Sequence, residues 1–137
     1  MKIVRYNKFI NDAYIVREKV FIIEQGFIDE VDFIDSYATH IVIYDKDNPI
    51  GTCRVFLDNN EYKLGRLAVL KEYRGKGIGK ILVNEAEKHV KTVGGKSIVL
   101  HSQLQAKGFY NKAGYTEFGE IDYEENHPHI WMRKVLW

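Results

Sequence analysis

Residues 71–80 read KEYRGKGIGK, a segment that is both glycine-rich and basic. Glycines at the alternate positions 75, 77 and 79 let the backbone approach a ligand closely and direct successive N–H groups toward it. A helix beginning there would add its own unsatisfied N–H groups and its dipole. Four basic residues and one acidic residue give the segment a charge of +3. These features together predict a site that holds a diphosphate.

Two common nucleotide-binding motifs do not fit this segment. A Walker A loop needs a serine or threonine after its Gly-Lys pair, but Ile81 follows Gly79-Lys80 here. A dinucleotide-binding Gly-x-Gly-x-x-Gly pattern fails in both frames, because Lys80 and Leu82 stand where its last glycine is required. A tight turn with incidental lysines is the alternative interpretation.

Around this segment, hydrophobic spacing predicts strands alternating with helices. The expected elements are a strand at 2–6, a helix from an N-cap at Asn7 to Gln25-Gly26, a loop or short helix at 28–36, strands at 38–45, 50–57 and 61–69, a helix at 77–93, a strand at 97–100, a helix at 103–113, a strand at 115–119, an acidic loop and a strand at 129–136. Short turns between the three central strands favour an antiparallel meander. The order indicates a mixed α/β sheet in one domain spanning residues 1–137.

The strand expected at 61–69 changes its apolar face partway along. Tyr62 and Leu64 lie at even positions, whereas Leu67 and Val69 lie at odd ones. A strand that keeps one face inward while slipping by one residue needs a bulge, which a glycine would allow at Gly65-Arg66. A strand buried on both faces is the alternative.

Composition narrows the class of protein. The 137 residues carry 20 basic and 19 acidic side chains, a net charge of +1, and 45% of them are hydrophobic. This balance argues against a nucleic-acid-binding protein and against a disordered chain. Cys53 is the single cysteine, so we expect a buried strand residue and no intramolecular disulfide. Without a signal peptide or a long apolar stretch, we expect a cytoplasmic protein with no membrane partner.

Two motifs carry a family resemblance. The pattern Arg-x-x-Gly-x-Gly at residues 74–79, preceded by RLAV at 66–69, resembles the acyl-CoA-binding motif of the GNAT superfamily of N-acetyltransferases. Residues 103–115 resemble the family's second signature, with Gln103 where asparagine is common. The helix end at 20–25 and the segment 127–132 are similar to the small ElaA/YjcF-like branch.

The resemblance implies a fold and a cofactor site. The GNAT fold is a mixed, mostly antiparallel twisted sheet with flanking helices, in which two parallel strands, here 61–69 and 97–101, splay apart. Acetyl-CoA would be the cosubstrate, with its pantetheine arm between these strands. The residues expected to bind it are Leu67, Ala68, Val69, Arg74, Gly75, Lys76, Gly77, Ile78, Gly79, Lys80, Gln103 and Tyr110.

The implied chemistry is transfer of an acetyl group to a primary amine by direct attack in a ternary complex. Tyr110 matches the family's general acid, which protonates the leaving thiolate; a packed core aromatic is the alternative. Glu24 and His101 are the candidate bases, each with an alternative structural role. His127 and His129 alone are too few ligands for a metal, so we expect none.

Two other functions stay open. The chain could be a non-catalytic module that binds or senses acyl-CoA, or a structural or regulatory subunit. The acceptor would be a small molecule or a peptide, and a homodimer is left open.

Charge is unevenly distributed along the chain. The acidic residues of 24–35, with no basic residue among them, are Glu24, Asp29, Glu30, Asp32 and Asp35, and those of 120–129 are Glu120, Asp122, Glu124 and Glu125. We therefore expect acidic segments around the acceptor, favouring a cationic amine, opposite a basic loop that meets the anionic cofactor. Ordinary solvated acidic loops are the alternative.

Overall fold

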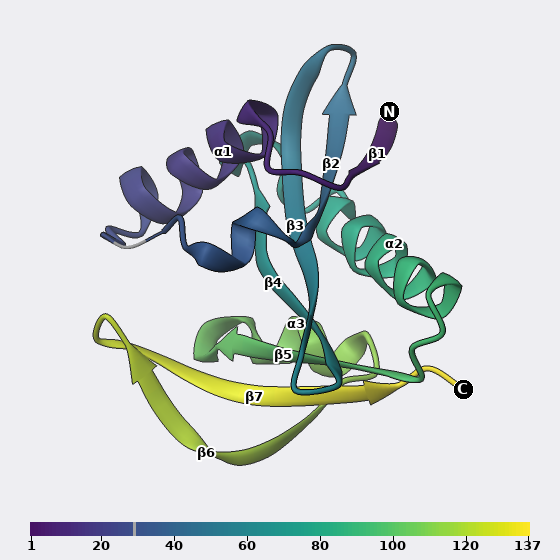
Figure 1. The fold of residues 1–137 in the computed structure, drawn as a ribbon. Coiled ribbons are helices and arrows are strands. Elements are labelled where there is room, and N and C mark those ends of the chain that lie inside the picture. The colour runs from purple at the N-terminus through teal and green to yellow at the C-terminus, as the bar shows by residue number, and fades with distance from the viewer. Residues whose placement is uncertain (29) are drawn as a thin grey trace.

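The computed structural model describes residues 1–28 and 30–137; Asp29 lies outside the described residues. One seven-stranded sheet has the order β1-β2-β3-β4-β5-β7-β6 (Figure 1). Its strands are β1 (Lys2–Tyr6), β2 (Thr39–Asp45), β3 (Asn48–Asp58), β4 (Glu61–Val69), β5 (Ser97–Gln103), β6 (Thr116–Glu124) and β7 (His127–Val135). The helices are α1 (Asn11–Arg17), which continues as a π-helical segment at Glu18–Glu24, α2 (Ile78–Thr92) and α3 (Lys107–Lys112). Short 3-10 helices lie at Phe33–Ser36, Lys71–Tyr73 and Leu104–Ala106.

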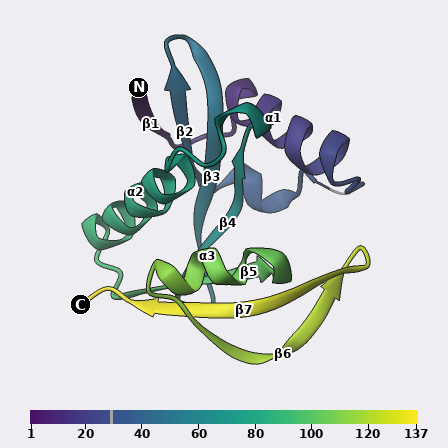
Figure 2. The same cartoon turned by 180° about the vertical axis from the view of Figure 1, so that it is seen from behind.

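Helices α1 and α2 cover opposite faces of the β1–β4 part of the sheet, as both views show (Figures 1 and 2). Alternation along β2 explains this, because successive side chains of a strand point to opposite faces. Ile41 and Ile43 join the cluster that contains the apolar side of α2, while Val42 and Tyr44 pack with Ala13 of α1. The mixed α/β fold and the predicted element order are confirmed.

Strand β4 contains the predicted bulge. Thr52 pairs with Ala68 and Arg54 pairs with Gly65, so that two residues of β4, Arg66 and Leu67, stand opposite Cys53 alone. The left-handed residue of the bulge is Arg66, with φ of 52°, rather than the glycine before it. The expectation that Gly65 supplies the unusual backbone conformation was therefore wrong, although the position of the bulge was right.

Strands β4 and β5 run parallel but stay together only briefly. Their register contains the pairs Lys63–Val99 and Leu64–Leu100. Past Leu64, β4 turns through its bulge while β5 continues along β7 to the pair Gln103–His129. The two strands therefore diverge toward their carboxyl ends, as the resemblance implied, and one edge of residues 65–69 is left without a neighbouring strand among the described residues.

Two predicted elements differ in the structure. Helix α1 begins at Asn11 rather than after Asn7, because Phe9 and Ile10 pack as extended chain on the face that carries Val42. The acidic loop expected after Gly119 is instead the end of a hairpin, since β6 extends to Glu124 and pairs with β7. Its turn uses left-handed Glu125 and Asn126 in place of the glycine that usually marks such turns.

Cys53 is fully buried on β3, as predicted, and burial raises the pKa of its thiol. Among the described residues, the helices are too short or too polar to span a bilayer.

Candidate functional site

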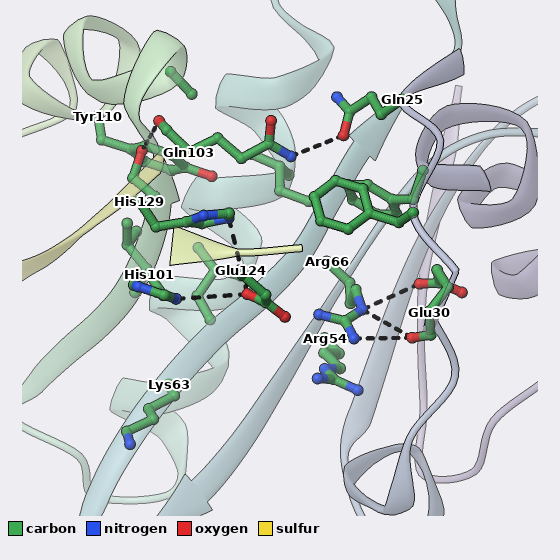
Figure 3. A pocket seen from close by; sticks show the side chains of 18 of the residues that line it. Gln25, Glu30, Arg54, Lys63, Arg66, His101, Gln103, Tyr110, Glu124 and His129 are labelled. Atoms are coloured by element: carbon green, nitrogen blue, oxygen red, sulfur yellow. Dashed lines mark hydrogen bonds and ion pairs between the residues drawn. The ribbon is translucent and has the colours of Figure 1, made fainter. Parts of the chain in front are cut away.

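A cavity of about 590 Å³ lies where β4 and β5 diverge. Its wall includes Leu67 of β4, Gln103 of β5, Tyr110 of α3, Glu124 of β6 and His129 of β7, together with residues of segment 21–34 and of β3. Figure 3 shows side chains from these elements pointing toward the same space. The cavity therefore unites residues that are distant in sequence at the one place where the sheet opens.

The β4 edge supplies backbone groups to this cavity. Leu67 lines it, whereas Ala68 is buried and pairs with β3. Val69 also pairs with β3, and its carbonyl accepts a hydrogen bond from Nε of Arg74 at 3.0 Å. Because the other edge of this segment faces the opening between the strands, its backbone can pair with an extended ligand, as a missing strand would.

The glycine-rich loop leads directly into α2. Gly75 and Gly77 have φ values of 76° and 80°, and a Cβ on either would meet no atom within 4 Å. Conformation rather than space thus requires glycine at both. Ile78, the first residue of α2, has a buried side chain, so it can offer a ligand only its backbone. The first N–H groups of α2 have no partner within the helix and form an anion-binding terminus.

Gly79 and Gln103 hold neighbouring elements together. A Cβ on Gly79 would lie 3.3 Å from Cζ of Phe109, so this glycine allows α2 to approach α3 closely. Gln103 lines the cavity, and its Nε2 donates to Oε1 of Gln25 at 2.8 Å. This bond joins the end of β5 to the residue that follows the π-helical segment. The exposed side chains of Lys76 and Lys80 add positive charge to the loop.

Glu24 and Arg74 form a bidentate ion pair, with distances of 2.6 and 2.7 Å between their nitrogens and oxygens. This hydrogen bonding lowers the pKa of Glu24. Arg74 lines the cavity, whereas Glu24 is not among the residues that line it. Of the two candidate bases only His101 lines the cavity, and the geometry of Glu24 suits a carboxylate that holds Arg74 in place.

Tyr110 is a core residue that also lines the cavity, so its role as a general acid stays a prediction. It belongs to the main hydrophobic cluster, in edge contact with Phe109 and Tyr115, and it also lines the cavity. Burial raises the pKa of its phenol, so the group is neutral and keeps its proton at physiological pH. A neutral O–H in this position can donate a proton to a reacting atom.

His101, Glu124 and His129 form what we call the histidine–glutamate cluster. One Glu124 oxygen, Oε2, lies 3.7 Å from Nδ1 of His101 and 3.9 Å from Nε2 of His129. Nε2 of His101 is 2.6 Å from Oδ1 of Asp122, and Nδ1 of His129 is 2.8 Å from the carbonyl oxygen of His127. Figure 3 shows both imidazoles turned toward the carboxylate.

The charges in this cluster differ between the two histidines. Burial lowers the pKa of His101, but hydrogen bonds to Glu124 and Asp122 outweigh it and raise the pKa overall. For His129, burial dominates and lowers the pKa. The hydrogen bond with His101 lowers the pKa of Glu124 against the effect of burial, and the charge of Arg66 contributes. These shifts favour a neutral His129 beside an ionised Glu124.

Sequence reasoning did not assign His129 or Glu124 to the site. His129 was noted as part of a His-Pro-His motif, and Glu124 was counted only as one charge of an acidic segment. The register places Asp122 opposite His129 in the hairpin and His101 opposite Trp131. Recognising residues 120–124 as a strand would have been the signal.

A buried network of charges underlies the opposite wall. This arginine–carboxylate network consists of Arg17, Glu30, Asp32, Asp35, Arg54 and Arg66. Arg17 lies 2.8 Å from Asp35, and the side chains of both are at most 3% exposed. The guanidinium of Arg54 lies 2.6 Å from Asp32 and 2.9 Å from Asp35.

The network corrects the expected charge pattern around the cavity. Glu30, Asp32 and Asp35 are paired with three arginines, and Glu24 is paired with a fourth. Segment 24–35 is therefore not an unpaired acidic rim, and its remaining acidic residue, Asp29, lies outside the described residues. Glu30 and Asp32 line the cavity as partners of arginines, whereas Glu124 on the 120–129 side lines it beside two histidines.

Comparisons with known proteins agree with this arrangement. Residues 19–136 match the family model described as "Acetyltransferase (GNAT) domain". The chain is 36% identical over 128 residues to "Uncharacterized N-acetyltransferase YjcF" of Bacillus subtilis (strain 168), covering 91% of each. The crystal structure of Escherichia coli ElaA superimposes with a TM-score of 0.87 at 22% identity, over 98% of this chain and 99% of that one. A crystal structure of aminoglycoside 6'-N-acetyltransferase complexed with coenzyme A gives a TM-score of 0.79 at 20% identity, over 100% and 98%.

Proposed function

Because this chain belongs to the GNAT acetyltransferase family, we propose that it transfers the acetyl group of acetyl-CoA to a primary amine by direct attack in a ternary complex. The observation that carries the proposal is the cavity at the diverging strands, which has Arg74 of the glycine-rich loop and a neutral tyrosine, Tyr110, on its wall. Membership of the family supports acetyl-CoA as the acetyl donor. The shape of the cavity supports the binding of both substrates.

The residues present fit acetyl-CoA. The left-handed Gly75 and Gly77 open the loop, so that the N–H groups from Arg74 to Lys80 can bind the diphosphate with help from the side chains of Arg74 and Lys76. The free edge of Leu67–Val69 can pair with the pantetheine arm, next to Gln103. Bound there, acetyl-CoA would bring an activated thioester into the cavity.

The protein's own groups then serve the reaction. A backbone N–H of the Leu67–Val69 edge stabilises negative charge as it develops on the carbonyl oxygen. The phenol of Tyr110 donates a proton to the leaving sulfur. The cavity walls, which include Phe109 and Leu100, exclude water from the thioester. No step of this scheme calls for a metal ion.

Removing the Tyr110 hydroxyl tests its role as general acid. We expect Tyr110→Phe to lower kcat for acetyl transfer about 100-fold, the lower end of the range for general acid catalysis, because a thiolate is already a fair leaving group. Affinity for CoA should stay the same. The matched control is Tyr115→Phe, which removes a neighbouring buried hydroxyl that donates to Glu87 outside the cavity. Equal rates for Tyr110→Phe and Tyr115→Phe would contradict the role.

The enzyme and a non-catalytic acyl-CoA-binding module make different predictions. Both should be stabilised against heat by CoA, by about 2.7 kcal/mol at one hundred times the dissociation constant. Only the enzyme should release CoA thiol when acetyl-CoA is mixed with a panel of primary amines. Thermal stabilisation without amine-dependent thiol release would favour the module, and no stabilisation by CoA would contradict both.

A further inference from the structure

The inference concerns the histidine–glutamate cluster and rests on the proposed acetyl transfer. We propose that Glu124 and His129 form a site that binds the acceptor as a primary alkylammonium ion and removes its proton, with Nε2 of His129 as the proton acceptor. Asp122 and His101 act as positioning residues that hold Glu124. The acceptor would therefore be a strongly basic primary amine.

The hydrogen bond made by Nδ1 of His129 determines the role of its other ring nitrogen, Nε2. A carbonyl oxygen can only accept, so Nδ1 must donate its proton to the oxygen of His127 at 2.8 Å. In the neutral ring, Nε2 is then left as an acceptor. This nitrogen lies 3.9 Å from Oε2 of Glu124, a second acceptor. Two acceptors at this separation suit an ammonium group that donates one N–H to each.

His101 is unsuited to the same task. Both of its nitrogens face carboxylates, Asp122 at 2.6 Å and Glu124 at 3.7 Å, so the protonated ring has an acceptor on each side. A protonated imidazole cannot take a further proton, but it can orient the carboxylate of Glu124. The structure therefore assigns base chemistry to His129 rather than to His101.

The ligand atoms of the same three residues lie within 4.8 Å of one another, a spacing that could also hold a metal ion, but the orientation of the two rings favours a hydrogen-bonding cation. The His101 and His129 rings are stacked, with centroids 4.6 Å apart and planes inclined by 29°. A metal ion binds in the plane of each imidazole that ligates it, and two stacked rings are less suited to meeting this requirement at one point. A hydrogen-bonding cation carries several donors in different directions, so it does not need the two rings to share one point.

The side chains around Glu124 and His129 further restrict which amine can bind. Phe27 stacks on His127 with centroids 4.3 Å apart, and Trp131 stacks on His101 at 4.4 Å. Phe27 and Trp131 both line the cavity and can cover the alkyl part of an amine. Arg66 lies on the far side of Glu124 and would repel a second positive charge. These contacts favour an amine with an apolar neighbour over a polycation.

Every proton in this reaction is accounted for without a further reactant. The ammonium gives one proton to Nε2 of His129, and the freed lone pair attacks the thioester carbonyl, so that a C–N bond forms. The C–S bond breaks with its electron pair on sulfur, which takes the proton of Tyr110. A second proton from the new amide nitrogen restores Tyr110, and His129 returns its proton to solvent.

The test compares His129→Gln with the wild type on two probes of different basicity. Ethylamine resembles a lysine amine, with a pKa of about 10.4, and glycinamide carries an α-amine of about 7.7–8.0. At pH 7 we expect kcat/KM of the variant to fall about 100- to 1,000-fold for ethylamine, and at most about 10-fold for glycinamide, which is partly neutral already. Raising the pH to 9 should reduce the loss of kcat/KM in the variant for both amines.

The pH profile provides a second readout. His129 faces His101, Asp122 and Glu124 on neighbouring strands and His127 on its own strand. The neutral ring of His129 is the active form, and its pKa lies below the ordinary 6.5. Wild-type activity should therefore fall as the pH drops through this lowered pKa. The variant should lose this inflection and follow the basicity of the amine. Glu124→Gln, at a half-exposed position, should raise KM for both amines and still fold.

Three results would overturn the inference. One is an equal loss for ethylamine and glycinamide in His129→Gln, since damage to the fold affects both alike. Another is an unchanged KM in Glu124→Gln. The third is loss of wild-type activity on EDTA treatment with recovery on adding Zn²⁺. A wild-type protein that binds CoA and acetylates neither amine would instead refute the proposed function.

Discussion

Replacing Asp35 with alanine should lower the free energy of unfolding by about 3–5 kcal/mol. Burial favours the neutral form of this carboxyl, but hydrogen bonds and charges from Arg17 and Arg54 outweigh it and hold the pKa at about 2. Removing the carboxylate leaves two guanidinium groups with side chains only 1% and 4% exposed. Arg17 keeps Glu30 and Arg54 keeps Asp32, but three arginines, Arg66 included, then share two carboxylates, so the cost is that of one uncompensated positive charge in a buried network. Urea denaturation of wild type and variant measures it.

The matched control is Glu61→Ala, which removes an ion pair of 2.8 Å with Arg133. Both side chains are about 40% exposed, so this change should cost only about 0–1 kcal/mol. A loss below about 1 kcal/mol for Asp35→Ala would show that the network does not hold this part of the fold. Because Glu30 and Arg66 line the cavity and belong to the network, the site would then need another support.

Replacing Gly77 with glutamate should weaken CoA binding roughly 100- to 10,000-fold. The new carboxylate stands at the start of α2 and repels the diphosphate, and at least two charge-assisted hydrogen bonds of about 1.5–3 kcal/mol each are lost. Gly77 has left-handed φ, so any side chain there also strains the backbone by about 1–2 kcal/mol. Isothermal titration with CoA measures the affinity directly.

A control for the strain lies at the other end of the same helix. Gly94 has φ of 89°, and a Cβ there would also meet no atom within 4 Å. Gly94→Glu should therefore destabilise the fold by a similar amount and leave CoA affinity unchanged. If the two variants bind CoA equally well, the diphosphate does not bind at the glycine-rich loop.

Features encoded locally were predictable from the sequence. The glycines and charges of 71–80 lie next to one another in the chain, so their conformation follows from nearby residues. The change of apolar face between Leu64 and Leu67 revealed the bulge, because a one-residue slip inverts every later side chain. The opening of the sheet between residues 61–69 and 97–101 was instead implied by the family resemblance that these local motifs carry.

Features that depend on contacts between distant residues were not predictable in the same way. His101 and His129 are 28 positions apart in the sequence, and the pairing of β5 with β7 stacks their rings. Arg17 and Arg54 neutralise an acidic segment that looks unpaired when it is read alone. A hairpin turn without glycine concealed the strand that carries Glu124. Electrostatic pairing and strand register therefore decide which of these side chains face the cavity, and neither can be read from local spacing.

The central claim is that an acetyl group moves from CoA to an amine in this cavity. The most direct measurement uses acetyl-CoA labelled in its acetyl group, a panel of primary alkylamines, and mass spectrometry of the products. The account predicts labelled N-acetylated amine in equal amount with released CoA thiol, at a rate reduced in Tyr110→Phe. Release of thiol with labelled acetate and no acetylated amine, or no release although CoA binds, would contradict it.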